Sequence, residues 1–167
     1  GIKSGAGVNF ASSTIDVKEV KDTLISAVNV SFAKSTVSAG ASAKGIVAEK
    51  GITFDESGLS IGAASTVGLQ AASIVFKNGS TLELADIGSK PVTKSDNFTF
   101  ADSTLRFNPG KATRNAPIIQ VKNAPVMTGK NAMDFTAVPN GTFTILTAAL
   151  PEKESLDKSK TIDTFGN

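Results

Sequence analysis

The chain has 167 residues and a net charge of +2, from 17 Lys and Arg against 15 Asp and Glu, and it contains no Cys and no His. One domain of this length can bury a hydrophobic core without disulfides, and its small charge does not favour a nucleic acid or a membrane surface as partner. The absence of Cys excludes thiolate metal ligands, and the absence of His excludes the commonest metal ligand, which is also the side chain that titrates near neutrality. We therefore expect no metal ion and no cofactor.

A phenylalanine ends the first predicted strand and recurs along the chain at an almost constant spacing. The first four of these markers lie 22 residues apart, and the next four follow after 24, 21, 22 and 22 residues. This register predicts a repeating unit of about 22 residues. The markers are Phe10, Phe32, Phe54, Phe76, Phe100, Val121, Phe143 and Phe165.

The residues around each marker repeat with it, which a chance column of phenylalanines would not do. Apolar residues stand two positions before most markers and about five, seven and fifteen positions after them, so apolar and polar residues alternate as in strands with one buried face. The columns hold Val8, Val30, Ile52, Ile74, Phe98 and Ile119; Ile15, Val17, Val37, Ala39, Leu59, Ile61, Leu82, Leu84, Leu105 and Phe107; and Ile25, Val47, Leu69 and Val92.

Short polar segments separate the apolar runs and predict the corners of the repeat. Residues 40–44 are small enough for a tight corner, and Asn78–Gly79 predicts a turn. Residues 17–24 have some helical periodicity, but the apolar columns pass through them, so we predict strand and loop there. Ser57 falls in a predicted turn, and we therefore expect Ser57→Ala to be nearly silent.

Each repeat thus holds about three short strands, and such a unit cannot bury its apolar face alone. Stacking the units at about 4.7–4.9 Å joins their faces into one core with the phenylalanines inside. We predict an all-β β-solenoid of about seven coils of roughly 22 residues, over residues 1–150, and a polar loop or partial coil over residues 151–167. A β-sandwich has no reason to keep this register, and the chain lacks the leucine pattern of leucine-rich repeats.

Several repeated lines resemble those of autotransporter passengers and related bacterial surface adhesins. They are residues 52–61, residues 74–84 (IVFKNGSTLEL) and residues 140–148 (NGTFTILTA), the last of which is similar to the closing coil of such passengers. These passengers are right-handed parallel β-helices, so the resemblance implies that fold, that hand and export from the cell. The lack of Cys agrees with export, because an unfolded chain without thiols cannot be crosslinked in the periplasm.

A basic segment is the first candidate site. It contains both arginines of the chain and two lysines within 17 residues, and a loop leaving the column there could bind acidic sugars or a partner surface. An ordinary basic loop would have the same composition. The predicted ligand-binding residues are Arg106, Lys111, Arg114 and Lys122.

A corner with carboxylates is the second candidate site. The register brings Asp55, Glu56 and Asp102 to the same corner, together with Lys77 and Asn78. Oxygen ligands for a hard cation could gather there, and paired carboxylates serve as acid and base in glycoside hydrolysis. A solvated turn explains the same residues, because Asp, Asn and Lys are common in turns.

These features favour a structural or adhesive protein over an enzyme. We predict a protein without catalytic activity, extracellular or on the outer cell surface, with a glycan or protein of a host or neighbouring cell as partner. We also expect end-to-end self-association, because an open end of a solenoid exposes strand edges. The alternative is a carbohydrate-active β-helix enzyme, a polysaccharide lyase or hydrolase that acts on acidic polysaccharide at the Asp55, Glu56 and Asp102 corner.

Overall fold

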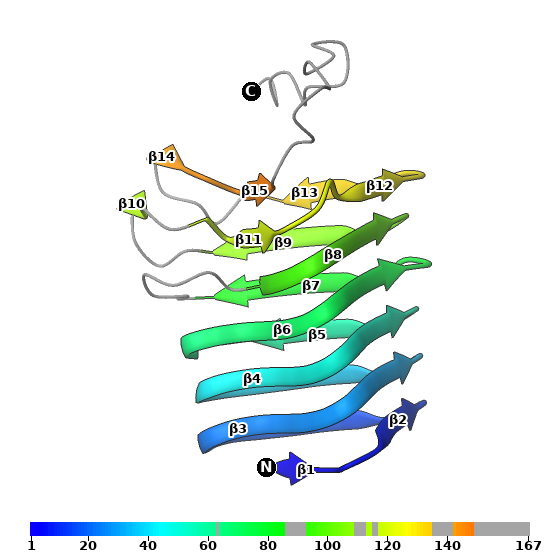
Figure 1. Ribbon diagram of the computed structural model, residues 1–167, viewed down its shortest axis with the longest axis vertical. Coiled ribbons are helices and arrows are strands. Elements are labelled where there is room, and N and C mark those ends of the chain that lie inside the picture. Colours follow the sequence, from blue (N-terminus) through cyan, green and yellow to red (C-terminus); the bar gives the residue numbers. More distant parts are fainter. Residues whose placement is uncertain (63, 86–92, 109–112, 115–116, 135–141, 149–167) are drawn as a thin grey trace.

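The chain coils into a β-solenoid whose turns stack along one axis (Figure 1). The computed structural model describes residues 1–62, 64–85, 93–108, 113–114, 117–134 and 142–148. These residues are all-β and form about five turns of about 23 residues each. The described residues include no helix with the length and apolar character that crossing a membrane requires.

Every pairing between the described strands is parallel, as a coiled chain requires. Two of the strands, β3 and β4, are 20 residues long and bend around a corner of the coil. The strands are β1 (Ile2–Lys3), β2 (Gly7–Ala11), β3 (Thr14–Ala33), β4 (Thr36–Asp55), β5 (Gly58–Ile61), β6 (Ala64–Lys77), β7 (Thr81–Ala85), β8 (Thr93–Ala101), β9 (Thr104–Asn108), β10 (Thr113–Arg114), β11 (Ile119–Val121), β12 (Val126–Thr128), β13 (Ala132–Asp134), β14 (Thr142–Phe143) and β15 (Leu146–Ala148).

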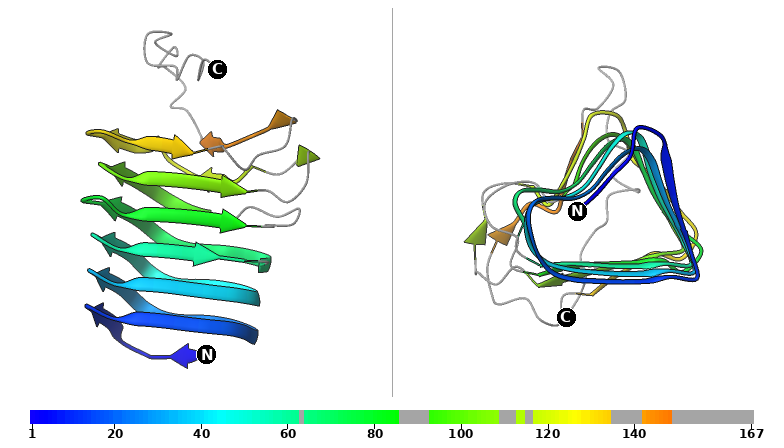
Figure 2. Two further views of the ribbon diagram at one scale, coloured as in Figure 1. Left: turned by 180° about the vertical axis from the view of Figure 1, so that it is seen from behind. Right: turned by 90° about the horizontal axis from the view of Figure 1, so that it is seen from below.

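Three parallel ladders make up the coil, which has a triangular outline when it is seen along the axis (Figure 2, right). The phenylalanine ladder joins residues 7–11, 29–33, 51–55, 73–77, 97–101 and 126–128. The leucine ladder joins residues 14–17, 36–39, 58–61, 81–85, 104–108 and 132–134. The isoleucine ladder joins residues 2–3, 25–27, 46–48, 69–71, 93–95, 119–121 and 146–148.

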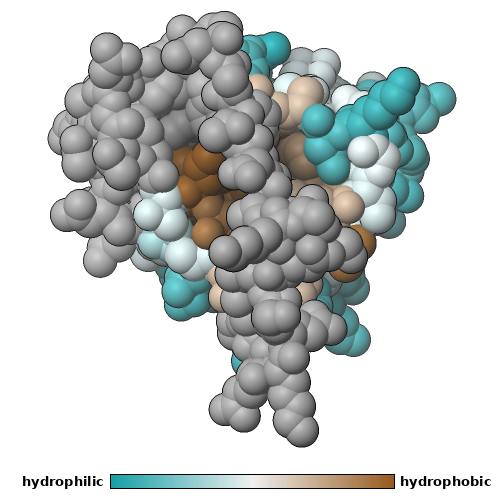
Figure 3. All heavy atoms as spheres, turned by 90° about the horizontal axis from the view of Figure 1, so that it is seen from above, coloured by the Kyte–Doolittle hydropathy of each residue, from teal (hydrophilic) through white to brown (hydrophobic). Residues whose placement is uncertain are grey.

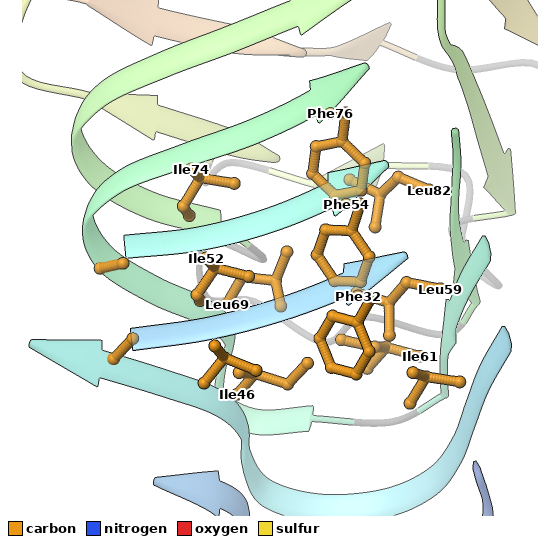
Figure 4. Close-up of a cluster of buried hydrophobic side chains, with 14 of the residues drawn as sticks. Phe32, Ile46, Ile52, Phe54, Leu59, Ile61, Leu69, Ile74, Phe76 and Leu82 are labelled. Carbon is orange, nitrogen blue, oxygen red and sulfur yellow. The ribbon is translucent and has the colours of Figure 1, made fainter. Parts of the chain in front are cut away.

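The predicted phenylalanine column is confirmed as a buried stack for the first turns. Phe32, Phe54 and Phe76 are each at most 1% exposed and lie one above the other inside the coil (Figure 4). Ring centroids are 4.8 Å apart between Phe32 and Phe54 and 4.6 Å apart between Phe54 and Phe76, with the planes within 8° of parallel. This distance equals the spacing of the strands that carry the rings.

The other two ladders supply the rest of the core. Because side chains alternate along a strand, every second residue of the leucine ladder points inward, and Leu59 and Leu82 pack toward the phenylalanine stack (Figure 4). The isoleucine ladder contributes Ile25, Ile46 and Leu69, which are fully buried. Burial of each such side chain contributes about 1.5–3 kcal/mol to folding.

A column of buried serines closes the corner between the phenylalanine and leucine ladders. Ser57 Oγ accepts a hydrogen bond from the backbone N–H of Ser35 at 3.0 Å and donates one to the carbonyl of Asp55 at 2.7 Å. Ser35 and Ser80 repeat this pattern on the neighbouring turns. The exposed-turn interpretation of Ser57 was therefore wrong, because its side chain lies inside the corner, where it pairs a buried backbone donor.

A left-handed backbone conformation, which the sharp corner needs, comes directly before Ser13, Ser35, Ser57 and Ser103 and two residues before Ser80, where Gly79 follows Asn78. The φ of the five non-glycine residues lies between 47° and 55°, and that of Gly79 is 78°. A residue with a Cβ is strained in this region, so the corner costs some stability that the serine hydrogen bonds offset. The five residues are Ser12, Lys34, Glu56, Asn78 and Asp102.

The predicted register is wrong in three places. Residue 121 does not continue the phenylalanine column: Met127 pairs with Phe100, and Val121 pairs with Ser95 in the isoleucine ladder. Phe143 pairs with Arg114 in a separate two-stranded sheet. Phe165 lies outside the described residues.

The third error has a local cause. Ile46, not Val47, continues the buried column from Ile25 to Leu69, because the pairing of β3 with β4 shifts between Val20 and Thr23. A one-residue shift exchanges the inner and outer faces of a strand. Val92 and residues 151–167 lie outside the described residues, and the prediction of seven coils is not confirmed.

Candidate functional site

The first predicted site residue, Arg106, lies on the outer face of β9 between two carboxylates. It pairs with Glu83 on the turn below and with Asp134 on the turn above. Its Nε donates to Asp134 Oδ2 at 3.1 Å, and its Nη1 lies 3.5 Å from Glu83 Oε2. The hydrogen bond to Asp134, followed by the charge of Glu83, raises the pKa of Arg106 above its ordinary value. Arg106 thus links three turns of the leucine ladder.

The structure does not bring the four predicted basic residues together into one described site. Lys122 follows β11 at the other side of the coil, where its side chain is exposed. Lys111 lies outside the described residues, and of Arg114 the structure describes only its backbone in β10.

The carboxylate corner is present, but two of its carboxylates are already engaged. Asp55 Oδ2 lies 2.9 Å from Lys77 Nζ, and Asp55 Oδ1 accepts a hydrogen bond from Asn78 Nδ2 at 2.7 Å. These two bonds, that of Lys77 first, lower the pKa of Asp55 below its ordinary value. Asp102 Oδ1 accepts from the backbone N–H of Lys130 at 2.8 Å.

The carboxylates of this corner are too far apart to form a metal site in the part of the chain that the structure describes. Glu56 and Asp102 lie on turns separated by the turn of Asn78, so their backbones are about two strand spacings, or roughly 9.6 Å, apart. The Glu56 carboxylate is directed toward Lys34, 4.0 Å away. Among the described residues no three acidic side chains gather in a way that could hold a metal ion.

A groove along the solenoid axis is the candidate site that sequence reasoning missed. It has a volume of about 800 Å³ and runs over the outer face of the isoleucine ladder. Its base is one ladder of consecutive partners on six stacked strands, so at about 4.8 Å a step it is roughly 24 Å long. The six residues of this base ladder are Lys3, Ser26, Val47, Gln70, Lys94 and Gln120.

One wall of the groove rises two residues after the base ladder. Glu49, Ala72, Asp96 and Lys122 line it, and the three charged residues among them are exposed. The outline of the coil is indented on one side, and the N-terminus lies at this indentation (Figure 2, right). Of the two predicted binding residues whose side chains the structure describes, Lys122 lines the groove and Arg106 does not.

Sequence reasoning missed the groove because a concave bend of the backbone creates it. The second shift in pairing, after Ala27 in β3 and after Val47 in β4, lies next to the groove. The sequence contains one signal that was not used: Gln70 and Gln120 each stand between two apolar residues, and Lys94 stands between two buried hydroxyl residues.

With this geometry described, the chain was compared with known proteins. No family model matches it, and neither the search of curated proteins nor the search of solved structures finds a match. The function therefore has to be argued from the residues of this chain alone.

The groove and the corner differ in what they can do chemically. At the corner, side chains bind one another and stabilise adjacent turns. In the groove, amine, amide and carboxylate groups face solvent in a row along the axis. Such a row can donate and accept hydrogen bonds at regular intervals, which suits a long ligand better than a small compact one.

Proposed function

We propose that the chain is a secreted or cell-surface structural and adhesive protein without catalytic activity. The observation that carries this proposal is a rod of stacked turns with a long open groove of unpaired polar side chains. The charged side chains at the corner, by contrast, are used to bind one turn to the next. A rod of this kind presents a long binding surface along its side, between its two ends.

We further propose that the coil is right-handed and belongs to the passenger type of bacterial surface adhesins. The course of the ribbon supports the hand: in Figure 1 the near strands run from left to right while the chain climbs from the N-terminus. On this proposal the chain lies outside the cell, and its partner is a glycan or protein on a host or neighbouring cell. Further turns beyond the described ones would bring the coil count toward seven.

The test of this proposal is adhesion by the folded chain. The full chain is immobilised and the attachment of cultured cells and of extracellular matrix preparations is measured, with the heat-unfolded chain as control. We expect attachment to the folded chain alone. Equal attachment to both forms, or to neither, would contradict an adhesive role.

The alternative, a carbohydrate-active enzyme at the Asp55, Glu56 and Asp102 corner, has a separate test. Acidic polysaccharides are incubated with the chain and calcium, and the release of shorter products is followed. Product release that is lost in Asp102→Ala would support the enzyme over the adhesin.

We also propose that the rods associate end to end. Val126 and Met127 on β12 are 51% and 37% exposed, and Ile2 at the other end is 41% exposed. Seen from above, the described residues that are visible are apolar near the middle of the view and mostly hydrophilic at its right margin (Figure 3). Unpaired strand edges beside apolar side chains favour pairing with another chain. Sedimentation that stays monomeric at rising concentration would contradict this association.

A further inference from the structure

The charged side chains of the groove are unpaired, unlike Asp55 and Lys77 at the corner and Arg106 on β9. Lys3, Lys94, Lys122, Glu49 and Asp96 form no ion pair within the described part of the chain. Lys122 lies directly above Asp96 in the ladder, because the N–H of Lys122 donates to the carbonyl of Ser95. Even these two neighbours are not within ion-pair distance. All five side chains are therefore available to a ligand.

The groove offers donors and acceptors in nearly equal number. Three ammonium groups donate, two carboxylates accept, and the amides of Gln70 and Gln120 do both. A hydroxyl group also donates and accepts. A ligand with many hydroxyl groups therefore matches this lining better than a ligand with a single kind of charge.

The length and regularity of the groove define the shape of the ligand. Side chains of the base ladder recur about 4.8 Å apart over roughly 24 Å, and three consecutive ones, Gln70, Lys94 and Gln120, are long and polar. Small residues such as Ala72 and Ser26 leave room between the long ones. A repeating polymer that lies along the axis can meet the same kind of contact several times, and contacts that are weak singly then add up.

We propose that this groove binds a linear, hydroxyl-rich polysaccharide along the solenoid axis. This proposal rests on the adhesive function proposed above, because the chain must lie outside the cell to meet such a polymer. Gln70, Lys94 and Gln120 at the base, with Lys122 on the wall, supply the principal hydrogen bonds. Neutral and acidic polysaccharides share the chemistry that this site recognises.

Two other polymers fit the groove less well. An extended peptide is usually bound through its backbone at a free sheet edge, but most strands beneath the groove pair on both sides, namely β3, β4, β6, β8 and β11. Single-stranded nucleic acid is bound by aromatic stacking and by strong positive charge, and the lining has no aromatic residue and a balance of three cations to two anions.

In the test, binding of the full chain is measured on an array of linear polysaccharides, some neutral and some acidic. The array shows which of these two classes the groove binds. For the polysaccharide that binds, a series of its oligosaccharides is then titrated by calorimetry. We expect affinity to rise with length until the oligosaccharide covers about 24 Å and then to level off. Affinity that is independent of length would overturn the axial orientation.

The matched variants are Lys94→Gln in the groove and Lys18→Gln on the exposed outer face of β3 away from it. We expect Lys94→Gln to weaken binding about three- to tenfold and Lys18→Gln to leave it unchanged. The double variant Gln70→Ala, Gln120→Ala changes two exposed side chains and should weaken binding at least about tenfold.

The outcomes distinguish this inference from the adhesive function. Cell attachment that persists in the double Gln variant, with no polysaccharide bound, would overturn the groove as the binding site and leave the adhesive role intact. Polysaccharide binding that depends on the groove, without cell attachment, would support the groove and contradict adhesion. Binding of a peptide or an oligonucleotide in place of polysaccharide would overturn the ligand class.

Discussion

Ser57 shows how much stability one small side chain can hold at a corner of the coil. Ser57→Ala removes the acceptor of the buried Ser35 N–H and leaves that donor unpaired. We expect the free energy of unfolding to fall by about 1–3 kcal/mol. Chemical denaturation of the variant measures this loss.

Ser60→Ala is the control for this prediction. Ser60 lies on the same short strand, β5, but is half-buried and makes no side-chain hydrogen bond within the described part of the chain. We expect it to change the unfolding free energy by less than about 0.5 kcal/mol. Equal effects of the two substitutions would mean that the serine column does not stabilise the corner.

Asp55 provides a test of the corner by pH. The hydrogen bonds from Lys77 and Asn78 lower the pKa of Asp55 in the folded chain. The carboxylate therefore contributes stability above the unfolded pKa of about 3.9, and this contribution is lost as pH falls through the lowered folded pKa. We expect the Asp55 carboxyl resonance, followed by NMR, to titrate below its ordinary value.

The variant Lys77→Met isolates the larger of the two causes. It removes the ammonium group 2.9 Å from Asp55 but keeps an unbranched side chain on the strand. We expect the titration midpoint of Asp55 to move upward toward its ordinary value. An unchanged midpoint would show that the ion pair does not persist in solution.

The serine column was visible in the sequence, yet its meaning was not. Serines recur three or four residues after each of the first five phenylalanine markers, at positions 13, 35, 57, 80 and 103. Serine is common in solvated turns, so composition alone favoured exposure. Only the structure shows that these serine side chains point into the corner, which makes them a buried ladder of hydroxyl groups and not an exposed one.

At the scale of the strands, Gly45 marks a place where two turns approach closely. A Cβ on Gly45 would overlap the backbone oxygen of Gly68 on the next turn, so the strands would have to separate. We expect Gly45→Ala to lower the unfolding free energy by about 1–3 kcal/mol. Gly58→Ala is the control, because a Cβ there meets only Thr36 Cγ2 at 4.0 Å. Thermal unfolding of the two variants should separate them.

The stability that a phenylalanine of the stack contributes should depend on its position in the column. Phe54 is fully buried between two rings, whereas Phe10 is half-buried and stacks on one ring only, 5.0 Å away. Phe54→Ala should cost about 3–5 kcal/mol and Phe10→Ala distinctly less. Equal losses in chemical denaturation would contradict the observed burial.

Strand register could be predicted wherever apolar residues alternate without interruption. Phe10 to Phe76 keep the expected spacing because the two pairing shifts within a turn cancel. Leu59 to Leu105 follow their column because the extra residue at the Asn78–Gly79 turn comes before Leu82. Val47 was misplaced because the pairing shifts at the corner just before it. A spacing rule counts residues and cannot locate such a shift.

For the whole molecule, the repeat determines the solenoid but not its groove. The spacing of apolar residues requires stacked turns, since only stacking buries their faces. The groove depends on where the turns bend inward, which is a property of backbone geometry. The structure separates two of the predicted basic residues for a related reason, because Arg106 and Lys122 are close in sequence but lie on different ladders. Their role in binding a ligand stays a prediction.

Stacked turns contact only their neighbours, so the stability of the rod should vary along its axis. The turns of β4 and β6 have neighbours on both sides and hold fully buried Ile52 and Ile74, whereas Val8 in β2 and Leu146 in β15 are half-buried at the two ends of the described coil. Hydrogen exchange should therefore be slowest for the backbone amides of β4 and β6 and faster toward both ends. Association of rods at their ends would slow exchange there as the protein concentration rises. Uniform exchange along the axis at low concentration would mean that the rod opens as one unit and that its turns are not independent.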